Sequence, residues 1–381
     1  MVIANSKSYG VPLYGASWLP LSLSRSKSED DSDDSPPSID ATRHVVLSGG
    51  GGEGKSGIPN AILVSQFYAD SNSLSDQPTY IEVTLVTMIY LYRWFEWDAV
   101  KSDDGHGWGL KSSEKVLNQL EDVGQQLALT FDDEGSVLAA GGEDGKLRVF
   151  KWPSMDSIID ESNAHASVKD LSFSPDGKFL ASVGSSGPGR IWEIASATAI
   201  AALQKVKDER FGFCRFSHSI ENHQVLYVTA MQGKGGSIIK WNTTSWKRIS
   251  SKHITSDSIT AFNVSADGKH LVVFRVPVTS GTHDLKKLVW YNKGTMEGDI
   301  LVLHSSSMRV HTVVKKAHLG IVTSLMFSHD SRALLSTSFD SSARVTLVAD
   351  KKERGTSLWI ILLIILLAMA MYYTKLVEML P

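Results

Sequence analysis

The 381-residue sequence has a single cysteine, Cys214, which leaves no pair for a disulfide framework. This shortage is typical of a protein in a reducing compartment. A strong excess of one charge is also lacking, because the formal net charge is −3 and no basic patch carries interleaved aromatic residues. We therefore predict no nucleic-acid partner. No N-terminal signal peptide is expected, since glycine and proline interrupt the first apolar stretch, 11–21.

The sequence does contain an internal repeat, in which an apolar residue precedes a short polar turn. The repeat units begin their turns at Phe131, Phe173, Phe216, Val264 and Phe327. The distance from Phe131 to Phe173 is 42 residues, and the next is 43. A period near 40–45 residues with several short strands per unit is the signature of a WD-type β-propeller. We therefore expect an all-β fold, a WD-repeat β-propeller of seven blades.

Each unit carries the residues that punctuate a WD repeat: a histidine before the first strand, an aspartate in a tight turn and an aromatic residue at the end. These residues are His165, His318, Asp144, Asp340, Phe150, Trp192 and Trp241. Histidine and aspartate together also suggest catalysis, but in WD repeats such residues hydrogen-bond within a blade. We expect a structural role for them and predict no catalytic residue.

Three segments depart from the repeat. The acidic, serine- and proline-rich stretch 21–42 is expected to be a disordered surface loop. Residues 274–293 are interpreted as an insertion, because their removal restores an interval of 43 residues. Residues 79–91 belong to a stretch without a turn residue at a place where a turn is due. Either this blade is incomplete or the sequence departs here from its relatives, for instance by mis-splicing, and we favour the second explanation.

A long apolar run lies near the C-terminus. Sixteen consecutive apolar residues extend from Leu358 to Tyr373, close to the roughly 20 that cross a bilayer. Aromatic residues stand near both ends, as they do at membrane interfaces. We therefore predict a single C-terminal transmembrane helix within an anchor segment, 351–374.

Charges around this run predict its orientation. Three basic residues precede it in 351–354, whereas only Lys375 follows. The positive-inside rule then places the propeller, 1–350, in the cytosol and the tail, 375–381, in the lumen. A run this short fits the thin membrane of the endoplasmic reticulum.

The glycine-rich segment 49–60 is the most informative part of the chain. Its first eight residues match the phosphate-binding pattern G-x-x-x-x-G-K-[ST]. A phosphate-binding loop needs a helix directly after it. Gly57 and Pro59 would fall in the first turns of that helix, where they cost about 1 and 3 kcal/mol. Because 61–67 instead has the composition of a strand, we interpret 49–60 as a loop between two strands, which binds a partner or has no role.

The opening segment 9–18, the loop end 57–60 and the C-terminal anchor together resemble the membrane-anchored guanine-nucleotide exchange factors of COPII vesicle budding. Among plant members, the chain is most similar to the phosphate transporter traffic facilitators. That similarity is carried by the phrases 122–129, 149–155 and 314–320. The resemblance covers the chain except for 21–42, 79–91 and 274–293.

The resemblance implies a first-blade loop that binds K⁺ and contacts the small GTPase of the coat. The matching positions are Gly49, Gly50, Gly51, Gly52, Gly57, Ile58, Pro59 and Asn60. Glycine lets backbone carbonyls converge on a monovalent cation, so K⁺ is expected at Gly50, Gly51 and Asn60. Ile58 and Pro59 offer a rigid apolar tip for the switch region of a GTPase.

Three functions remain open from the sequence. The first is an accessory protein of the endoplasmic reticulum membrane that promotes the exit of membrane cargo such as phosphate transporters. The second is an active guanine-nucleotide exchange factor for the coat GTPase, and the third is a membrane-bound interaction scaffold. None of them requires covalent catalysis.

Overall fold

The computed structural model describes residues 5–19, 43–52, 57–82, 93–102, 105–120, 123–206, 208–217, 224–233, 235–276 and 298–348, together with Leu366 and Met369. The chain forms two compact units, Met1–Leu347 and Val348–Pro381. The first unit holds every strand described here. In the second unit, Leu366 and Met369 are helical and exposed.

The first unit begins with an irregular sheet and a hairpin. The sheet contains β2 (Leu13–Trp18), β3 (Arg43–Gly49), β4 (Ala61–Tyr68), β5 (Ser73–Leu74) and β6 (Thr79–Glu82). Strands β5 and β6 pair with opposite ends of β4. The hairpin consists of β7 (Arg93–Ser102) and β8 (Gly105–Val116), and the 3-10 helix Asn118–Leu120 follows it. Between these two parts, residues 83–92 lie outside the described ranges.

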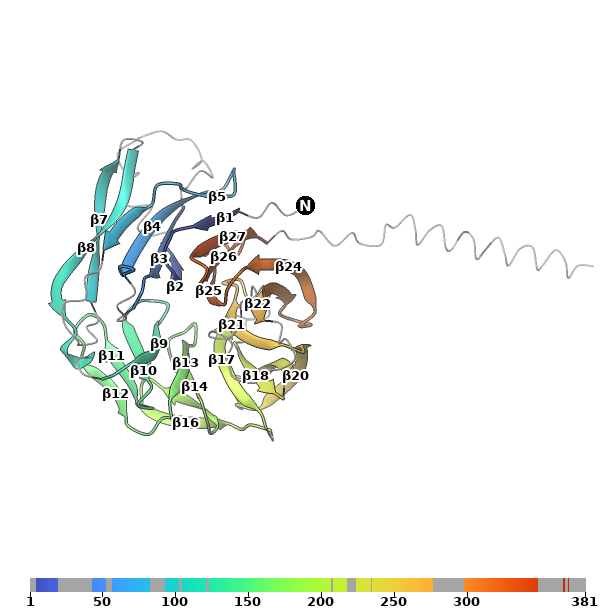
Figure 1. Cartoon of the computed structure of the whole chain (residues 1–381). Coiled ribbons are helices and arrows are strands. Elements are labelled where there is room, and N and C mark those ends of the chain that lie inside the picture. The colour runs from blue at the N-terminus through green and yellow to red at the C-terminus, as the bar shows by residue number, and fades with distance from the viewer. Residues whose placement is uncertain are drawn as a thin grey trace, which may run out of the picture. The chain divides into compact units, whose positions relative to one another are not determined.

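Four sheets of one plan follow, each with four consecutive strands paired in order (Figure 1). The first two contain β9 (Gln126–Phe131), β10 (Val137–Gly142), β11 (Leu147–Lys151) and β12 (Ser157–Glu161), then β13 (Val168–Phe173), β14 (Phe179–Gly184), β15 (Gly189–Glu193) and β16 (Thr198–Leu203). The next two contain β17 (Arg210–Ser217), β18 (Val225–Gln232), β19 (Gly235–Asn242) and β20 (Arg248–Thr255), then β21 (Ser258–Val264), β22 (His270–Val276), β23 (Gly298–His304) and β24 (Val310–His318).

The last sheet joins the two ends of the first unit. It contains β25 (Val322–Phe327), β26 (Ala333–Ser338) and β27 (Ser342–Leu347), with the N-terminal strand β1 (Asn5–Ser8) on its outer edge. Strand β1 pairs with β27 from Asn5 opposite Val345 to Ser8 opposite Ser342. The innermost strands contact their neighbours in the order β9, β13, β17, β21, β25 and β2. The described residues therefore form seven sheets, and the all-β propeller architecture is as predicted (Figure 1).

The hydrophobic core lies in layers between neighbouring sheets. Leu47 from β3 and Leu335 from β26 belong to one buried cluster, and Val183 from β14 and Leu226 from β18 belong to another. Each of these side chains is fully buried or nearly so. Because burying one such side chain contributes about 1.5–3 kcal/mol, the packing between sheets holds the first unit together.

A short polar turn recurs between the first two strands of the sheets, as its sequence predicts. In the turn after β13, Ser174 Oγ donates a hydrogen bond to Asp176 Oδ1 at 2.6 Å, and the Gly177 amide donates to the Ser174 carbonyl at 2.8 Å. Gly177 has φ +67°, a left-handed conformation that glycine adopts without strain. Ser265 and Ser328 repeat the hydroxyl-to-aspartate bond in later sheets.

The structure places part of the predicted insertion inside a sheet. Strand β22 continues through Phe274 and Arg275 to Val276. The Phe274 side chain is fully buried, and Arg275 forms ion pairs with Asp257 and Asp299 at 3.3 and 2.6 Å. Only 277–293 of the proposed segment therefore lie beyond the strand, and these residues are outside the described ranges.

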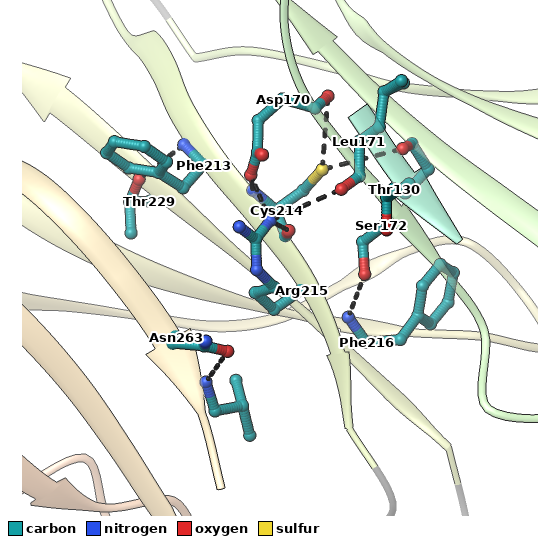
Figure 2. A network of polar contacts seen from close by, with 12 residues as sticks. Thr130, Asp170, Leu171, Ser172, Phe213, Cys214, Arg215, Phe216, Thr229 and Asn263 are labelled. Atoms are coloured by element: carbon teal, nitrogen blue, oxygen red, sulfur yellow. Dashed lines mark hydrogen bonds and ion pairs between the residues drawn. The ribbon is translucent and has the colours of Figure 1, made fainter. Parts of the chain in front are cut away.

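A charged network joins two neighbouring inner strands (Figure 2). Asp170 on β13 accepts hydrogen bonds from the Cys214 amide, at 2.9 Å, and from the Arg215 guanidinium, both on β17. The Phe216 amide donates to Ser172 Oγ at 3.0 Å. Burial raises the pKa of the Asp170 carboxyl, against the opposing effect of Arg215. The ion pair and the two amide bonds therefore fix the register between adjacent sheets.

The WD-type histidines hydrogen-bond within their own sheets, which agrees with a structural role. His165 Nε2 lies 2.8 Å from Ser182 Oγ, and Trp192 Nε1 donates to the same hydroxyl at 2.9 Å. The buried His318 contacts the hydroxyls of Ser342 and Ser336 at 2.7 and 2.8 Å. These bonds occupy both ring nitrogens of His318 and one ring nitrogen of His165.

We expect His165 to make folding pH-dependent. Burial, followed by Arg190 and Lys205, lowers the pKa of His165 from 6.5 to about 4. Between these values the unfolded chain binds a proton that the folded chain does not, so stability falls as the pH drops from 6.5 to 4 and is unaffected above 6.5. The loss is about 2–3 kcal/mol. Urea unfolding across this pH range should show a smaller fall for His165→Gln, and an equal fall in both proteins would contradict this assignment.

No helix in the described part of the chain is long and apolar enough to cross a membrane. The predicted span, 358–373, lies outside that part except for Leu366 and Met369. The predicted acidic loop, 21–42, and the tail, 375–381, also lie outside it.

Candidate partner-binding loop

The glycine-rich segment connects two paired strands. Strand β3 ends at Gly49, which pairs with Ala61 at the start of β4. Residues 53–56 lie outside the described ranges, but 57–60 lead directly into β4. The chain after the loop is therefore a strand, as predicted, and the residues from 57 to 68 provide no helix N-terminus to hold a phosphate.

Asn60 closes the loop at its base. Its Oδ1 accepts a hydrogen bond from the Gly52 amide at 2.9 Å, and its Nδ2 donates to the Gly52 carbonyl at 3.3 Å. The two bonds tie together residues eight positions apart in the sequence. The sequence indicated Asn60 as an oxygen donor for a cation, whereas the structure uses both ends of its amide to join the two sides of the loop.

Gly50 is held from the other side by the chain around the start of β2, namely Pro12 just before the strand and Tyr14 within it. Its amide donates to the Pro12 carbonyl at 2.9 Å, and its carbonyl accepts a hydrogen bond from Tyr14 Oη at 2.8 Å. Sequence reasoning did not include Tyr14 or Pro12 in the site. Both lie in the segment 9–18 that carries the family resemblance, and this membership is the feature of the sequence that could have pointed to them.

The backbone at Gly50 requires glycine. Its φ is +136°, a conformation that other residues rarely adopt. A Cβ placed there would lie 2.4 Å from both Cα and Oδ1 of Asn60 and 2.7 Å from the Pro59 carbonyl oxygen. By contrast, a Cβ at Gly52 or Gly57 would meet no atom within 4 Å. The close packing of the loop is therefore confined to its base.

The end of the loop next to β4 is open to solvent. Gly57, Ile58 and Pro59 are exposed, and 38% of the Ile58 surface is accessible. Gly49 and Gly50 are buried, and Gly51 and Asn60 are half-buried. The predicted residues therefore lie in one connection between β3 and β4, in which the apolar pair Ile58 and Pro59 is exposed.

Binding of K⁺ at Gly50, Gly51 and Asn60 stays a prediction. The Asn60 Oδ1 and Pro59 carbonyl oxygens lie within 2.7 Å of the position that a Gly50 Cβ would take, but Asn60 Cα is also 2.4 Å from that position, so a cation would have to lie elsewhere at the base. Neutral carbonyl oxygens of this kind replace the hydration shell of K⁺ in proteins. Asn60 Oδ1 already accepts the Gly52 amide, so a cation would use its second lone pair. Among the described residues, no group of three or more histidine, cysteine or acidic side chains could hold a metal ion.

Comparison with known proteins finds a matching family model, related proteins and similar solved structures. The family model "WD domain, G-beta repeat" matches residues 121–151, 157–192 and 309–346. The "SEC12-like protein 2" of Arabidopsis thaliana is 44% identical over 93% of this chain and 91% of its own length. The "SEC12-like protein 1" of the same plant is 29% identical over 65% of this chain and 58% of its own length.

More distant relatives lie outside plants. The "Guanine nucleotide-exchange factor SEC12" of Mus musculus is 22% identical over 67% of this chain and 62% of its own length. Among solved structures, the β-propeller domain of Myceliophteria thermophila Cps50 (Swd1) is 17% identical, with a TM-score of 0.47 over 61% of this chain and 68% of that domain.

Proposed function

The chain belongs to the SEC12-like protein family, and from this premise we propose that it is an accessory protein of the endoplasmic reticulum membrane that promotes the exit of membrane cargo. Phosphate transporters bound for the plasma membrane are the cargo that we infer. The observation that carries the proposal is the loop 49–60, whose exposed tip adjoins a hydrogen-bonded base. This arrangement supports binding to a protein partner, namely the small GTPase of the COPII coat.

The loop can act through contact alone. Ile58 and Pro59 place an apolar tip against the partner, and the bonds of Gly50 and Asn60 hold the base before the partner arrives. Such pre-organisation lowers the entropy lost on binding. K⁺ held by oxygens of Gly50, Gly51 and Asn60 would add a positive charge at the base. The chain needs no acid, base or nucleophile for this action.

Loss of the protein tests the proposed function directly. Cells depleted of the chain should deliver a tagged phosphate transporter to the plasma membrane more slowly and retain it in the endoplasmic reticulum. The full-length chain should restore delivery, whereas a secreted soluble cargo serves as the control. Normal transporter delivery after depletion would contradict the proposal.

The second candidate is an active exchange factor for the coat GTPase. It is favoured by the relatives in Mus musculus and Rattus norvegicus that are named guanine nucleotide-exchange factors. The full-length chain in liposomes would then accelerate release of labelled GDP from the GTPase. Binding of the GTPase without faster release of GDP supports the accessory role. If the chain neither binds the GTPase nor accelerates GDP release, the third function, an interaction scaffold, remains.

We further propose that 351–374 anchors the protein in the membrane, with 1–350 in the cytosol and 375–381 in the lumen. Asn242 offers a test, because it begins the glycosylation pattern Asn-Thr-Thr and is exposed at the end of β19. A cytosolic Asn242 carries no glycan. A glycan on Asn242 in protein isolated from cells would reverse this orientation.

A further inference from the structure

The base of the glycine loop is bonded to the place where the propeller closes. The segment 9–12 leads from β1, which pairs with β27, to β2. Two hydrogen bonds hold Gly50 there. The Pro12 carbonyl accepts one from the Gly50 amide, and the Tyr14 hydroxyl donates the other to the Gly50 carbonyl. Removal of the Tyr14 hydroxyl would therefore take a hydrogen-bond donor away from the carbonyl of a buried residue.

Tyr14 is in turn held by the last sheet. Its ring packs edge-on against Phe339, between β26 and β27, with ring centroids 5.4 Å apart and an interplanar angle of 78°. The Phe339 amide donates to the Ile321 carbonyl at 3.1 Å, which fixes the backbone there. Thr323 Oγ1 donates to the carbonyl of Leu13, next to Tyr14, at 2.9 Å. The position of the Tyr14 ring therefore depends on the sheet that contains β1.

We propose that Tyr14 is a positioning residue for the loop 49–60 and that Phe339 orients it. Its hydroxyl fixes the Gly50 carbonyl, and the ring contact with Phe339 transmits the geometry of the closing sheet to the loop base. An edge-to-face aromatic pair prefers this geometry, so the hydroxyl is aimed before a partner binds. The consequence for partner binding rests on the proposed function, whereas the positioning itself does not.

Removal of one hydroxyl tests the positioning. In full-length Tyr14→Phe, amide hydrogen exchange at Gly50 and Gly52 should become about threefold to tenfold faster, the range expected for one lost hydrogen bond. The melting temperature should fall by no more than about 2–4 °C, the shift expected for one lost hydrogen bond in a domain of this size. Phe339→Leu should accelerate the same amides.

Tyr68→Phe is the matched control. Tyr68 is 43% exposed and lies in the same sheet, but its hydroxyl donates to Gln66 at 3.0 Å. This variant should leave Gly50 and Gly52 unchanged. Equal exchange in Tyr14→Phe and Tyr68→Phe would overturn the positioning role.

Binding of the purified coat GTPase to the same variants separates this inference from the proposed function. Faster loop exchange together with weaker GTPase binding in Tyr14→Phe supports both. Faster exchange with unchanged GTPase binding supports the positioning role and counts against this partner. Unchanged exchange overturns the positioning role, whatever the binding shows.

Discussion

Gly50→Val is expected to weaken binding to the coat GTPase by at least tenfold while the propeller stays folded. Valine cannot adopt φ +136° without strain, and its Cβ would collide with Asn60 and with the Pro59 carbonyl. Most of the atoms that it meets belong to the backbone, so the loop must rearrange to admit it. We expect GTPase affinity to fall by at least tenfold, which corresponds to about 1.4 kcal/mol.

Gly135→Asn is the control for this substitution. Gly135 lies outside the loop, between β9 and β10, with φ +69° and open space where a Cβ would stand, and asparagine tolerates this region. Its partner binding should stay near that of the wild type, and circular dichroism should show the same fold in both variants. If Gly50→Val bound as well as Gly135→Asn, the close packing at Gly50 would have no part in the site.

Asp170→Ala is expected to cause the largest loss of stability. It leaves Arg215 without its carboxylate and the Cys214 amide without its acceptor, at a place where the Asp170 side chain is only 12% exposed. Breaking a buried ion pair from one side costs about 3–5 kcal/mol, and the 28% exposure of Arg215 favours the lower value. Urea unfolding monitored by tryptophan fluorescence measures this loss.

Asp76→Ala provides the matched surface substitution. Its ion pair with Lys7 has a carboxylate that is 88% exposed, so its removal should cost less than about 1 kcal/mol. In Asp170→Ala/Arg215→Met the uncompensated charge is gone, and part of the lost stability should return. A loss for Asp170→Ala no larger than that for Asp76→Ala would contradict the role of the network.

The sequence predicted the parts of the fold that depend on local chemistry. The turn from Ser174 to Gly177 is formed by side chains two or three residues apart, so its spacing could be recognised directly. Strand β1 escaped prediction because its polar sequence has no strand signature, and its partner β27 lies at the other end of the propeller. The insertion was predicted to begin at Phe274, whereas β22 continues to Val276. Removing enough residues to restore the repeat interval gives the length of an insertion but does not fix its first residue.

The same distinction applies to the loop. Gly57 and Pro59 excluded a phosphate-binding helix from the sequence alone, since their cost depends only on the local backbone. The bonds of Gly50 and Asn60 could not be inferred in this way. Tyr14 lies 36 residues from Gly50 and meets it only because β2 and β3 pair in one particular register.

The most direct test of the account is the delivery of a phosphate transporter in cells whose only copy of this chain carries Ile58→Asp. The substitution places a charge on an apolar side chain that is 38% exposed. Ile249→Asp is the control, because Ile249 is 53% exposed on β20 in a different sheet. We predict that Ile58→Asp retains the transporter in the endoplasmic reticulum as strongly as depletion does, whereas Ile249→Asp delivers it normally. Normal delivery with Ile58→Asp, in a protein present at wild-type level, would contradict the assignment of this loop.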